Sequence, residues 1–578
     1  MEMVNLIIDG IKIEVPKGTT VLEASKLIGV KIPTLCFLKE INEVASCRMC
    51  VVQVGQKLLA SCTLPAENEM DIKTNTADVR EARKMVVELL LSNHKRECTT
   101  CIRSENCELQ TIAKDLNIRD IRYSGEKSCG IKDDSSSSVV RDPEKCILCG
   151  RCISTCGNVQ SVHAINFGGR GFETKVTTIY ERPLKDSVCI NCGQCILACP
   201  VGALHEKDSI KPVWKAIENP NKYVVVQTAP AVRVAIGEEF GMAIGSRVNG
   251  KMASALRKLG FEKVFDTDFA ADLTIMEEGT ELLNRLGSGE NLPLMTSCCP
   301  GWVKFVEHNF PDMISNLSTC KSPSEMEGAL IKSYFAEKIG VDAKNIVVVS
   351  IMPCVGKKFE GEREELSNEG MLDVDYVLTT RELAQMIKEA GIDFVNLKDE
   401  EFDDPFGKST GASVIFGSTG GVTEAALRTV FELLAGKELE EIEYSVVRGQ
   451  EGIKEVTIEL PDGRNITAAV THGLGNARKL MGLVKSGEKH YDFIEAMACP
   501  GGCVNGGGQP IVDSRMKEKI NIIYERAKAI YDEDKVLPIR KSHKNPHIIK
   551  IYEEFLGKPN GHLSHKLLHT KYTMRNKF

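Results

Sequence analysis

The chain has 578 residues, and its 73 basic and 80 acidic side chains give a formal net charge of −7. This length predicts several domains, while the near balance of charge gives no indication of a nucleic-acid or membrane surface. No apolar run is long enough to cross a bilayer, and the opening MEMVNLIIDGIKIEV is typical of a hairpin, not of a signal peptide or twin-arginine leader.

The 22 cysteines are the most informative feature of the composition, because most of them stand in close sets with metal-ligand spacing. In a large chain without a secretory signal, such sets indicate metal and not disulfides. We therefore expect a cytoplasmic metalloprotein, and an anaerobic cell if its clusters are sensitive to oxygen.

Residues 1–78 are predicted to form a ferredoxin-like domain with one 2Fe–2S cluster. NLIID-G-IKIEV alternates across a glycine, which predicts a β-hairpin, and TVLEASKLIG has the pattern of a helix that begins at a threonine N-cap. Four cysteines follow with gaps of ten, two and eleven residues, a variant of the plant-type pattern, whose first gap is shorter. The segment resembles the N-terminal β-grasp ferredoxin domain shared by FeFe hydrogenases and the large iron–sulfur subunit of respiratory NADH dehydrogenases; a zinc site is the alternative. The predicted ligands are Cys36, Cys47, Cys50 and Cys62.

Residues 79–125 are predicted to hold a 4Fe–4S cluster with one histidine ligand. VREARKMVVELLLSN has helical periodicity and is followed at once by His94. A lone histidine at a helix end is ordinarily a surface residue or a partner of the helix dipole. Here Cys98, Cys101 and Cys107 follow within one short loop. The segment resembles the module with one histidine and three cysteine ligands found in the same two families, so ligation by His94 is favoured.

Two ferredoxin repeats are predicted in residues 139–209. The composition around Ser135 and Ser138 is polar and serine-rich, which favours a linker, and Cys129 before it has no predicted role. Both repeats read C-x-x-C-x-x-C-x-x-x-C, and in two-cluster ferredoxins the fourth cysteine of each run ligates the other cluster. We expect Cys146, Cys149, Cys152 and Cys199 to hold one 4Fe–4S cubane, and Cys189, Cys192, Cys195 and Cys156 to hold the other. Clusters placed before a catalytic domain suggest an electron wire, although a structural role is the alternative.

Residues 210–512 have an α/β pattern in which three short apolar runs end at cysteines. The runs are PLMTSCCPGW, NIVVVSIMPCVGKK and YDFIEAMACPGGC. In such sheets ligands bind outside the carboxyl ends of the strands, and four thiolates from these loops are what an iron–sulfur cubane needs. The alternative is that the cysteines are small buried hydrophobes. ASVIFGSTGGV predicts a strand, a glycine-rich turn and a helix, alone a weak indication of phosphate binding, and neither a dinucleotide fingerprint nor a Walker A loop is found.

TSCCPGW, MPCVGKK and MACPGGC resemble the three signature segments of FeFe hydrogenases, and the resemblance extends over essentially the whole chain. In that family a 4Fe–4S cubane is bridged by one cysteine to a diiron unit with CO, cyanide and a dithiolate, which together form the H-cluster. The resemblance implies reversible conversion of protons and electrons into H2, with one 2Fe–2S and three accessory 4Fe–4S clusters. It implies that Cys503 is the bridge in a cubane site made of Cys299, Cys354, Cys499 and Cys503.

The resemblance also implies roles for residues around the cluster. Lys357 is expected to hydrogen-bond a cyanide ligand, and Met352 and Met497 to pack beside the diiron unit, with core filling as the alternative. Cys298 is expected to donate a proton to the bridging amine of the dithiolate. The expected outer relay is Glu281, Ser318 and Glu278, for which a solvated helix face is the alternative. The pocket wall is expected to include Ala229, Pro230, Gly420 and Gly421.

Four positions depart from the family pattern, and residues 513–578 form a distinct tail. Ala231, Thr423, Ser324 and Glu327 replace more usual residues, which leaves catalytic bias, rate and oxygen tolerance open. The tail is predicted to be helical and basic, and it resembles the separate small subunit of some periplasmic members. Its histidines lack tight ligand spacing, so we expect them at the surface.

Two other classes of function remain open from the sequence. One is an electron-transfer subunit like the respiratory iron–sulfur subunit, which shares residues up to about Ala203; the other is a non-catalytic assembly factor or hydrogen sensor. Without a nucleotide site, electrons are expected from ferredoxin or from a flavoprotein subunit that oxidises NAD(P)H. Maturation proteins are expected to supply the diiron unit. The chain resembles ferredoxin-linked monomers about as well as catalytic subunits of NAD(P)-linked multimeric hydrogenases.

Overall fold

The computed structural model describes residues 2–128, 130–436, 438, 442–459, 463, 465–517 and 519–577. Cys129, for which we expected no role, lies outside the described residues. The chain divides into two compact units. The first comprises Met1–Val159, His163–Ser187 and Gln194–His205, and the second comprises Gln160–Val162, Val188–Gly193 and Glu206–Phe578.

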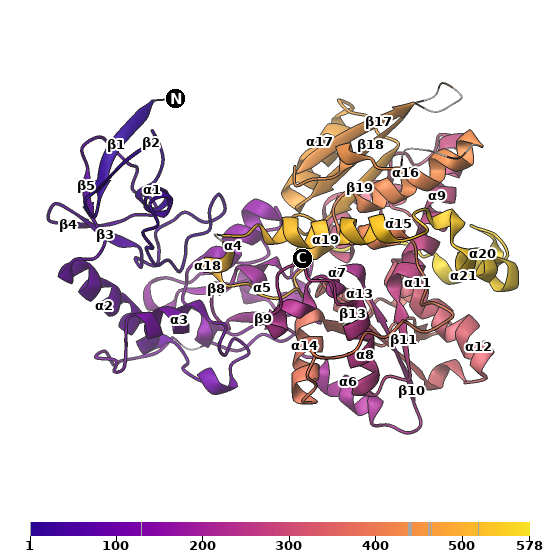
Figure 1. The fold of residues 1–578 in the computed structure, drawn as a ribbon, viewed down its shortest axis with the longest axis horizontal. Coiled ribbons are helices and arrows are strands. Elements are labelled where there is room, and N and C mark those ends of the chain that lie inside the picture. The colour runs from indigo at the N-terminus through magenta and orange to yellow at the C-terminus, as the bar shows by residue number, and fades with distance from the viewer. Residues whose placement is uncertain are drawn as a thin grey trace. The chain divides into compact units, whose positions relative to one another are not determined.

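The first unit begins with a five-stranded sheet of order β2-β1-β5-β3-β4 (Figure 1). The predicted hairpin is confirmed: Asp9 and Gly10, between its antiparallel strands, both have positive φ, as a tight hairpin turn requires. The predicted helix is confirmed as well, and Thr20 and Glu23 form a capping box at its start. The elements are β1 (Met3–Ile8), β2 (Ile11–Pro16), α1 (Val21–Leu27), β3 (Val51–Val54), β4 (Lys57–Ala60) and β5 (Asp71–Lys73).

The rest of the first unit consists mainly of short elements separated by cysteine-bearing loops. The prediction of a linker around Ser135 and Ser138 is wrong. Ser138 is fully buried, and the Ser136 hydroxyl accepts hydrogen bonds from the backbone N–H groups of Ser138 and Val139, so the polar side chains satisfy a folded turn. The elements are α2 (Ala77–Asn93), α3 (Glu108–Asp115), β6 (Val139–Arg141), α4 (Arg151–Ser154), β7 (Asn166–Gly168), β8 (Lys175–Thr177), α5 (Gln194–Ala198) and β9 (Leu204–Glu206).

The second unit contains two four-stranded sheets (Figure 1). The first, of order β11-β10-β13-β16, is entirely parallel, and its valine-rich strands are buried. In the second, of order β12-β19-β18-β17, only the β17–β18 pair is antiparallel. Parallel strands need crossover connections, which the intervening helices supply. The strands are β10 (Tyr223–Thr228), β11 (Lys263–Asp266), β12 (Leu294–Met295), β13 (Ile346–Met352), β16 (Tyr376–Thr379), β17 (Ile453–Glu459), β18 (Asn465–His472) and β19 (Phe493–Met497); β14 (Ser367–Asn368) and β15 (Met371–Leu372) form a separate hairpin.

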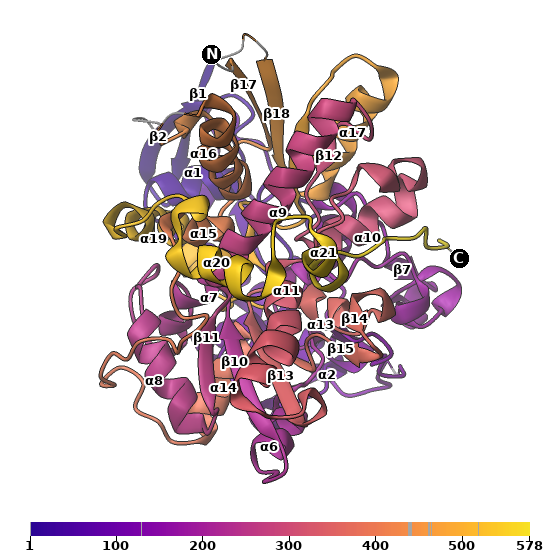
Figure 2. The ribbon, with the colours of Figure 1, turned by 90° about the vertical axis from the view of Figure 1, so that its right-hand side faces the viewer.

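The long helix α9 (Thr267–Ser288) connects the layers of this unit. It contacts α11 (Pro323–Leu330), α15 (Gly411–Val414) and α16 (Gly421–Ala435), and Figure 2 shows it running from the level of β17 and β18 toward α11. The strand predicted in ASVIFG is wrong, because α15 and a short 3-10 helix occupy it. A short buried apolar run does not distinguish a strand from a buried helix.

The other helices of the second unit complete its core, and the predicted helical tail is confirmed. None of the described helices combines the length and the apolarity that crossing a membrane requires. The helices are α6 (Ile210–Ile217), α7 (Pro230–Arg233), α8 (Asn249–Leu259), α10 (Pro300–Asn309), α12 (Ala336–Ile339), α13 (Gly356–Glu360), α14 (Thr380–Glu389), α17 (Leu474–Ser486), α18 (Ser514–Lys517), α19 (Ile522–Val536), α20 (Pro546–Ile551) and α21 (His562–Leu568).

Candidate metal and active site

Three loops of the second unit bring cysteines to one place. Cys299 lies between β12 and α10, and Cys354 lies between β13 and α13. Cys499 and Cys503 follow β19, and a 3-10 helix begins at Cys503. Each loop leaves the carboxyl end of a strand that has a parallel neighbour, which is the usual position of ligand sites in α/β sheets. The predicted position of the cysteines at strand ends is therefore confirmed.

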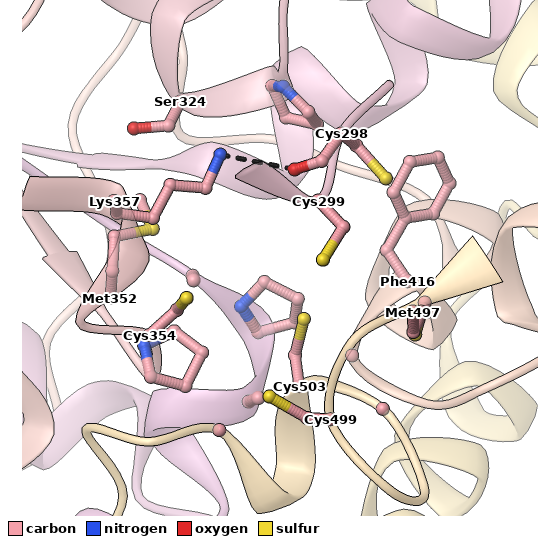
Figure 3. A pocket seen from close by; sticks show the side chains of 18 of the residues that line it. Cys298, Cys299, Ser324, Met352, Cys354, Lys357, Phe416, Met497, Cys499 and Cys503 are labelled. Carbon is pink, nitrogen blue, oxygen red and sulfur yellow. Dashed lines mark hydrogen bonds between the residues drawn. The ribbon is translucent and has the colours of Figure 1, made fainter. Parts of the chain in front are cut away.

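The four sulfur atoms face a common buried pocket (Figure 3). The empty space among its lining atoms, counted together with the solvent at its mouth, is about 810 Å³. Apart from the cysteines the wall is mostly apolar, and its polar groups are few. The other lining residues are Ala229, Pro230, Ala231, Thr267, Ala271, Cys298, Pro300, Pro323, Ser324, Met352, Pro353, Lys357, Phe416, Gly417, Met497, Ala498, Gly502 and Gly506.

The pocket disfavours free thiolates, which fits a metal-binding role. Burial, and then the neighbouring Cys299, raises the pKa of the Cys354 thiol to about 12. Burial and the neighbouring cysteines raise the pKa of Cys499 and of Cys503 as well. A coordinated metal removes the thiol proton and compensates its charge. Four sulfurs in a dry pocket therefore fit an iron–sulfur cubane better than they fit four free cysteines.

Glycines let the backbone close around this pocket. At Gly502, which has a φ of +98°, a Cβ atom would lie 2.6 Å from the backbone nitrogen of Thr419, and at Gly506 it would lie 2.2 Å from the carbonyl oxygen of Pro353. Gly420 and Gly421, which we expected in the wall, are not among its lining residues. They pack against the backbone carbonyls of other segments, while Phe416 and Gly417 line the pocket instead.

Lys357 lines the pocket, and its ammonium group donates hydrogen bonds to neighbouring residues of the protein. Nζ donates to Glu360 at 2.5 Å, to the Ser322 hydroxyl at 2.7 Å and to the Cys298 carbonyl at 3.3 Å, the contact drawn in Figure 3. Burial alone favours the neutral amine, but the carboxylates of Glu360 and Glu325 outweigh it and raise the pKa of Lys357. The pocket therefore contains a fixed positive charge suited to an anionic ligand.

Cys298 also lines the pocket, but Figure 3 shows its sulfur turned toward Phe416 and away from the other four. On α9, Glu278 is 4% exposed, and burial followed by the charge of Glu281 raises its pKa to about 8. The Ser318 hydroxyl donates to Glu281 at 2.8 Å. The alternative of a solvated helix face is wrong for both glutamates, because α9 is buried on this side.

The four departures from the family pattern have different surroundings. Ala231 and Ser324 line the pocket, and the Ser324 hydroxyl donates to Ser350 at 3.1 Å. Glu327 is fully buried outside the pocket wall, where burial raises its pKa well above the usual range. Thr423 donates through its hydroxyl to the buried carboxylate of Glu495 at 2.9 Å.

Comparison with known proteins agrees with this geometry. Residues 222–507 match the family model described as iron only hydrogenase large subunit, C-terminal domain, and residues 520–575 match iron hydrogenase small subunit. The chain is 50% identical over 100% of both lengths to the NADP-reducing hydrogenase subunit HndD of Solidesulfovibrio fructosivorans. The chain belongs to the iron-only hydrogenase family.

Other members and domains extend the family match. Iron hydrogenase 1 of Clostridium pasteurianum is 42% identical over 99% of this chain and 100% of its own. A structure of apo FeFe-hydrogenase HydA1 from Chlamydomonas reinhardtii superposes with a TM-score of 0.57 at 43% identity, over 63% of this chain and 98% of its own. Residues 1–77 match a 2Fe-2S iron-sulfur cluster binding domain, residues 83–122 the NADH-ubiquinone oxidoreductase-G iron-sulfur binding region, and residues 145–203 a 4Fe-4S dicluster domain. This iron-only hydrogenase thus combines ferredoxin-like domains with a catalytic domain in a mixed α/β fold.

The ferredoxin-like part of this hydrogenase brings several predicted ligands together. Cys36 and Cys47 share a hydrogen bond that lowers the pKa of Cys36 to about 5, and Cys62 likewise lowers the pKa of Cys50 to about 6. One cavity is lined by four cysteines of the predicted repeats, as expected for one cubane. These four are Cys146, Cys149, Cys152 and Cys199.

His94 is buried and not a surface residue. It is 8% exposed, and burial followed by the charge of Lys145 lowers its pKa, which favours the neutral ring that a metal requires. Its Nδ1 atom has no hydrogen-bond partner within the described part of the chain. Cys101 and Cys107 are near enough to influence each other, whereas Cys98 is exposed.

The second predicted ferredoxin set divides between the units. Cys189 and Cys192 belong to the second unit, whereas Cys156 and Cys195 belong to the first, so this grouping stays a prediction. The segment Val188–Gly193 is packed closely against the loops of the pocket. A Cβ atom at Gly507 would lie 2.5 Å from the carbonyl oxygen of Cys192 and 2.7 Å from the Cα atom of Gly193.

Sequence reasoning missed a cluster of buried polar side chains next to Glu281. Side-chain ligand atoms of Glu281, Cys320 and His569 all lie within 4.8 Å of one another. The expectation that the tail histidines are at the surface is therefore wrong for His569, which is 7% exposed. No local spacing pattern indicated it, because its partners come from α9 and from the segment before α11.

Proposed function

We propose that this iron-only hydrogenase interconverts two protons and two electrons with H2. The observation that carries the proposal is the convergence of Cys299, Cys354, Cys499 and Cys503 in one buried pocket that also contains Lys357. The four sulfurs supply the ligands of a cubane, and the ammonium group supplies positive charge beside it. Membership of the family supports the same activity.

The ligand roles are those that the family resemblance implies, and the pocket contains the residues for them. The four cysteines would hold the cubane of an H-cluster, with Cys503 as its bridge, and Lys357, Met352, Met497, Ala229 and Pro230 would contact the diiron unit. When bound, the H-cluster supplies the redox-active iron on which H2 is made or split. The chain itself excludes water with an apolar wall and offers a fixed ammonium donor, whose charge-assisted hydrogen bonds are stronger than neutral ones.

Protons would reach the pocket through Cys298. Its thiol lines the pocket without facing the other four sulfurs, so it is available to carry a proton at Sγ. Glu278, whose charge acts on the Cys298 thiol and whose pKa of about 8 lets it hold a proton near neutral pH, would supply Cys298. This order reverses the expected one, in which Glu281 comes first and Glu278 last. Ser318 and Glu281 would then connect Glu278 outward through their hydrogen bond.

Electrons would arrive through one 2Fe–2S and three accessory 4Fe–4S clusters. We assign them to a 2Fe–2S domain in residues 1–78, a histidine-ligated 4Fe–4S domain in residues 79–125 and a two-cluster domain in residues 139–209. The catalytic domain would be residues 210–512, with a small-subunit-like tail in residues 513–578. The buried His94 ring supports its role as a ligand.

The external electron partner is either ferredoxin or a flavoprotein subunit that handles NAD(P)H. The similarity to a subunit of an NADP-reducing hydrogenase over the full length favours the second. Maturation proteins would deliver the diiron unit, and a cytoplasmic location remains our expectation. Purification from the native source would identify the partner by what accompanies the chain.

Infrared spectroscopy of the anaerobically matured protein tests the proposal. We expect stretching bands of CO and cyanide, together with H2 production from a chemical reductant. A protein that carries all accessory clusters but shows neither the bands nor H2 production would contradict it. That result would indicate an electron-transfer subunit or an assembly factor.

A further inference from the structure

The buried imidazole of His569 is held in a defined orientation. Its Nε2 atom lies 3.1 Å from Oε2 of Glu277, and its Nδ1 atom lies 2.7 Å from the hydroxyl oxygen of Thr319. In the tautomer with its hydrogen on Nε2, the ring donates to Glu277, because a carboxylate accepts hydrogen bonds. In the neutral ring, Nδ1 is then an acceptor with a lone pair that can take a proton.

This ring lies beside the outer end of the proposed relay. The backbone N–H of Thr319 donates to Oε2 of Glu281 at 3.1 Å, and the Cys320 thiol lies 3.9 Å from the same oxygen. One side-chain ligand atom from each of Glu281, Cys320 and His569 lies within 4.8 Å of the other two. One thiol or one water molecule can span the distance between Glu281 and His569. His569 is therefore within a single bridging step of Glu281.

Arg285, which also binds Glu281, does not transfer protons. Arg285 donates to Oε1 of Glu281 at 2.6 Å, but a guanidinium stays protonated in proteins and offers no acceptor. An imidazole, by contrast, gains and loses a proton near neutral pH. Of the two groups, only His569 has the chemistry of a proton carrier.

His569 lies close to the solvent-exposed surface, next to His565. Its ring stacks on that of His565, with centroids 4.5 Å apart and planes 10° from parallel. His565 is exposed on α21. The titratable groups that face this pair are Glu277, Glu281, Cys320, Tyr552 and Lys571.

We propose that His569, oriented by Glu277, is the proton station beyond Glu281 and exchanges protons with solvent at His565. This inference rests on the proposed hydrogenase function. During H2 oxidation, the Glu281 carboxyl group loses a proton across the bridging thiol or water, and Nδ1 of His569 gains it. The imidazolium, balanced by the Glu277 carboxylate, then gives the proton to solvent water beside exposed His565 and returns to its neutral form. During H2 production the proton moves in the opposite direction.

His569→Gln separates titration from hydrogen bonding. A glutamine amide donates to Glu277 and accepts from Thr319, but it carries no proton across neutral pH. In the matured holoenzyme we expect H2 production and H2 oxidation to fall several-fold, with a larger solvent deuterium isotope effect because proton supply becomes limiting. The pH dependence of turnover should differ from that of the wild type. Iron content and the CO and cyanide bands should remain as in the wild type.

His562→Gln is the matched control, because His562 is an exposed histidine on α21, the helix that carries His565. It should turn over like the wild type. The infrared carboxyl band of Glu281 gives a measurement that does not depend on turnover. The pH dependence of this band should differ from wild type in His569→Gln and match wild type in His562→Gln. Added imidazole should restore part of the activity of His569→Ala.

The possible outcomes distinguish a failure of the proton-station proposal from a failure of the proposed hydrogenase function. Wild-type protein that makes no H2 would contradict the hydrogenase proposal itself. Wild-type activity with a His569→Gln variant that matches it at every pH would overturn the proton station alone. If His569→Gln loses iron, His565→Gln replaces it as the test, since that residue is exposed. A smaller loss of rate with a raised isotope effect would support the route, and an unchanged rate would overturn it.

Discussion

The two units of the molecule hold their cysteines in different ways. In the first unit the members of a set lie close together in sequence, as in the buried Cys36, Cys47, Cys50 and Cys62. In the second unit the pocket cysteines come from three distant loops at strand ends; Cys499 is buried and the other three are partly buried. The first kind of site depends on local spacing, whereas the second exists only when the whole domain is folded. Loss of one ligand should therefore remain local in the first unit and disable the pocket in the second.

The largest contrast is expected between a pocket ligand and a ferredoxin ligand. Cys499→Ser should abolish H2 production and the CO and cyanide bands, because the cubane site loses a thiolate in a dry pocket. Cys50→Ser should remove only the 2Fe–2S signal and leave H2 production from a small chemical reductant largely intact. Electron paramagnetic resonance and infrared spectra of both variants measure this. Equal loss of activity in the two would contradict the comparison.

Cys298→Ser tests a cysteine that shares the pocket without being a predicted ligand. Serine has nearly the same shape, but its hydroxyl is a far weaker acid than a thiol, whose reference pKa is about 8.5. The variant should keep its full iron content and infrared bands and lose most turnover in both directions. Cys298→Asp, which again titrates, should recover part of the rate with a shifted pH profile. Loss of the cluster in Cys298→Ser would make Cys298 a ligand.

Glu278→Gln removes the buried carboxyl group of the relay. Burial raises the pKa of Glu278 to about 8, against about 4.3 for a free glutamate. Between these values the folded protein binds more protons than the unfolded chain, so this group lowers the free energy of unfolding as pH rises. The variant should lose most turnover, and its thermal midpoint should decline less with pH than that of the wild type. An unchanged pH slope would place the pKa of Glu278 in its ordinary range.

A histidine ligand in the first unit should give a smaller, local effect. His94→Ala should change the paramagnetic resonance signal and iron content of one cubane, while the infrared bands of the pocket stay unchanged. An identical spectrum and iron count would mean that His94 is buried for structural reasons alone.

The smallest effect is expected at Thr423, behind the pocket. Thr423→Val preserves shape but removes the hydroxyl that donates to buried Glu495, and an unsatisfied buried acceptor costs about 1–3 kcal/mol. The free energy of unfolding should fall by that order, with the infrared bands unchanged. The backbone N–H groups of Gly420 and Thr423 still bind Glu495, so a loss of the cluster would contradict this reading.

Sequence patterns predicted what depends on nearest neighbours along the chain. The hairpin around Gly10, the helix beginning after Thr20 and the cysteines at strand ends all follow from turn chemistry, capping or periodicity. They did not predict what depends on packing between distant segments. Ser138 is buried in a turn whose backbone N–H groups donate to the Ser136 hydroxyl, and the segment after Thr410 is a helix because a buried apolar run suits either structure. His569 is buried because the tail packs beside α9, which no local pattern records.

The close approach at Gly193 and Gly507 also sets where the protein can be divided. Segment Val188–Gly193 belongs to the second unit, its Asn191 accepts a hydrogen bond from Lys304 at 2.8 Å, and neither glycine leaves room for a side chain. A catalytic fragment that begins at residue 210, the predicted boundary, would expose the face that this segment covers, including apolar surface around Ile190. The shortest fragment that keeps this face covered therefore starts before Val188, and protein engineers who exchange the electron-transfer domains must carry this segment with the catalytic part.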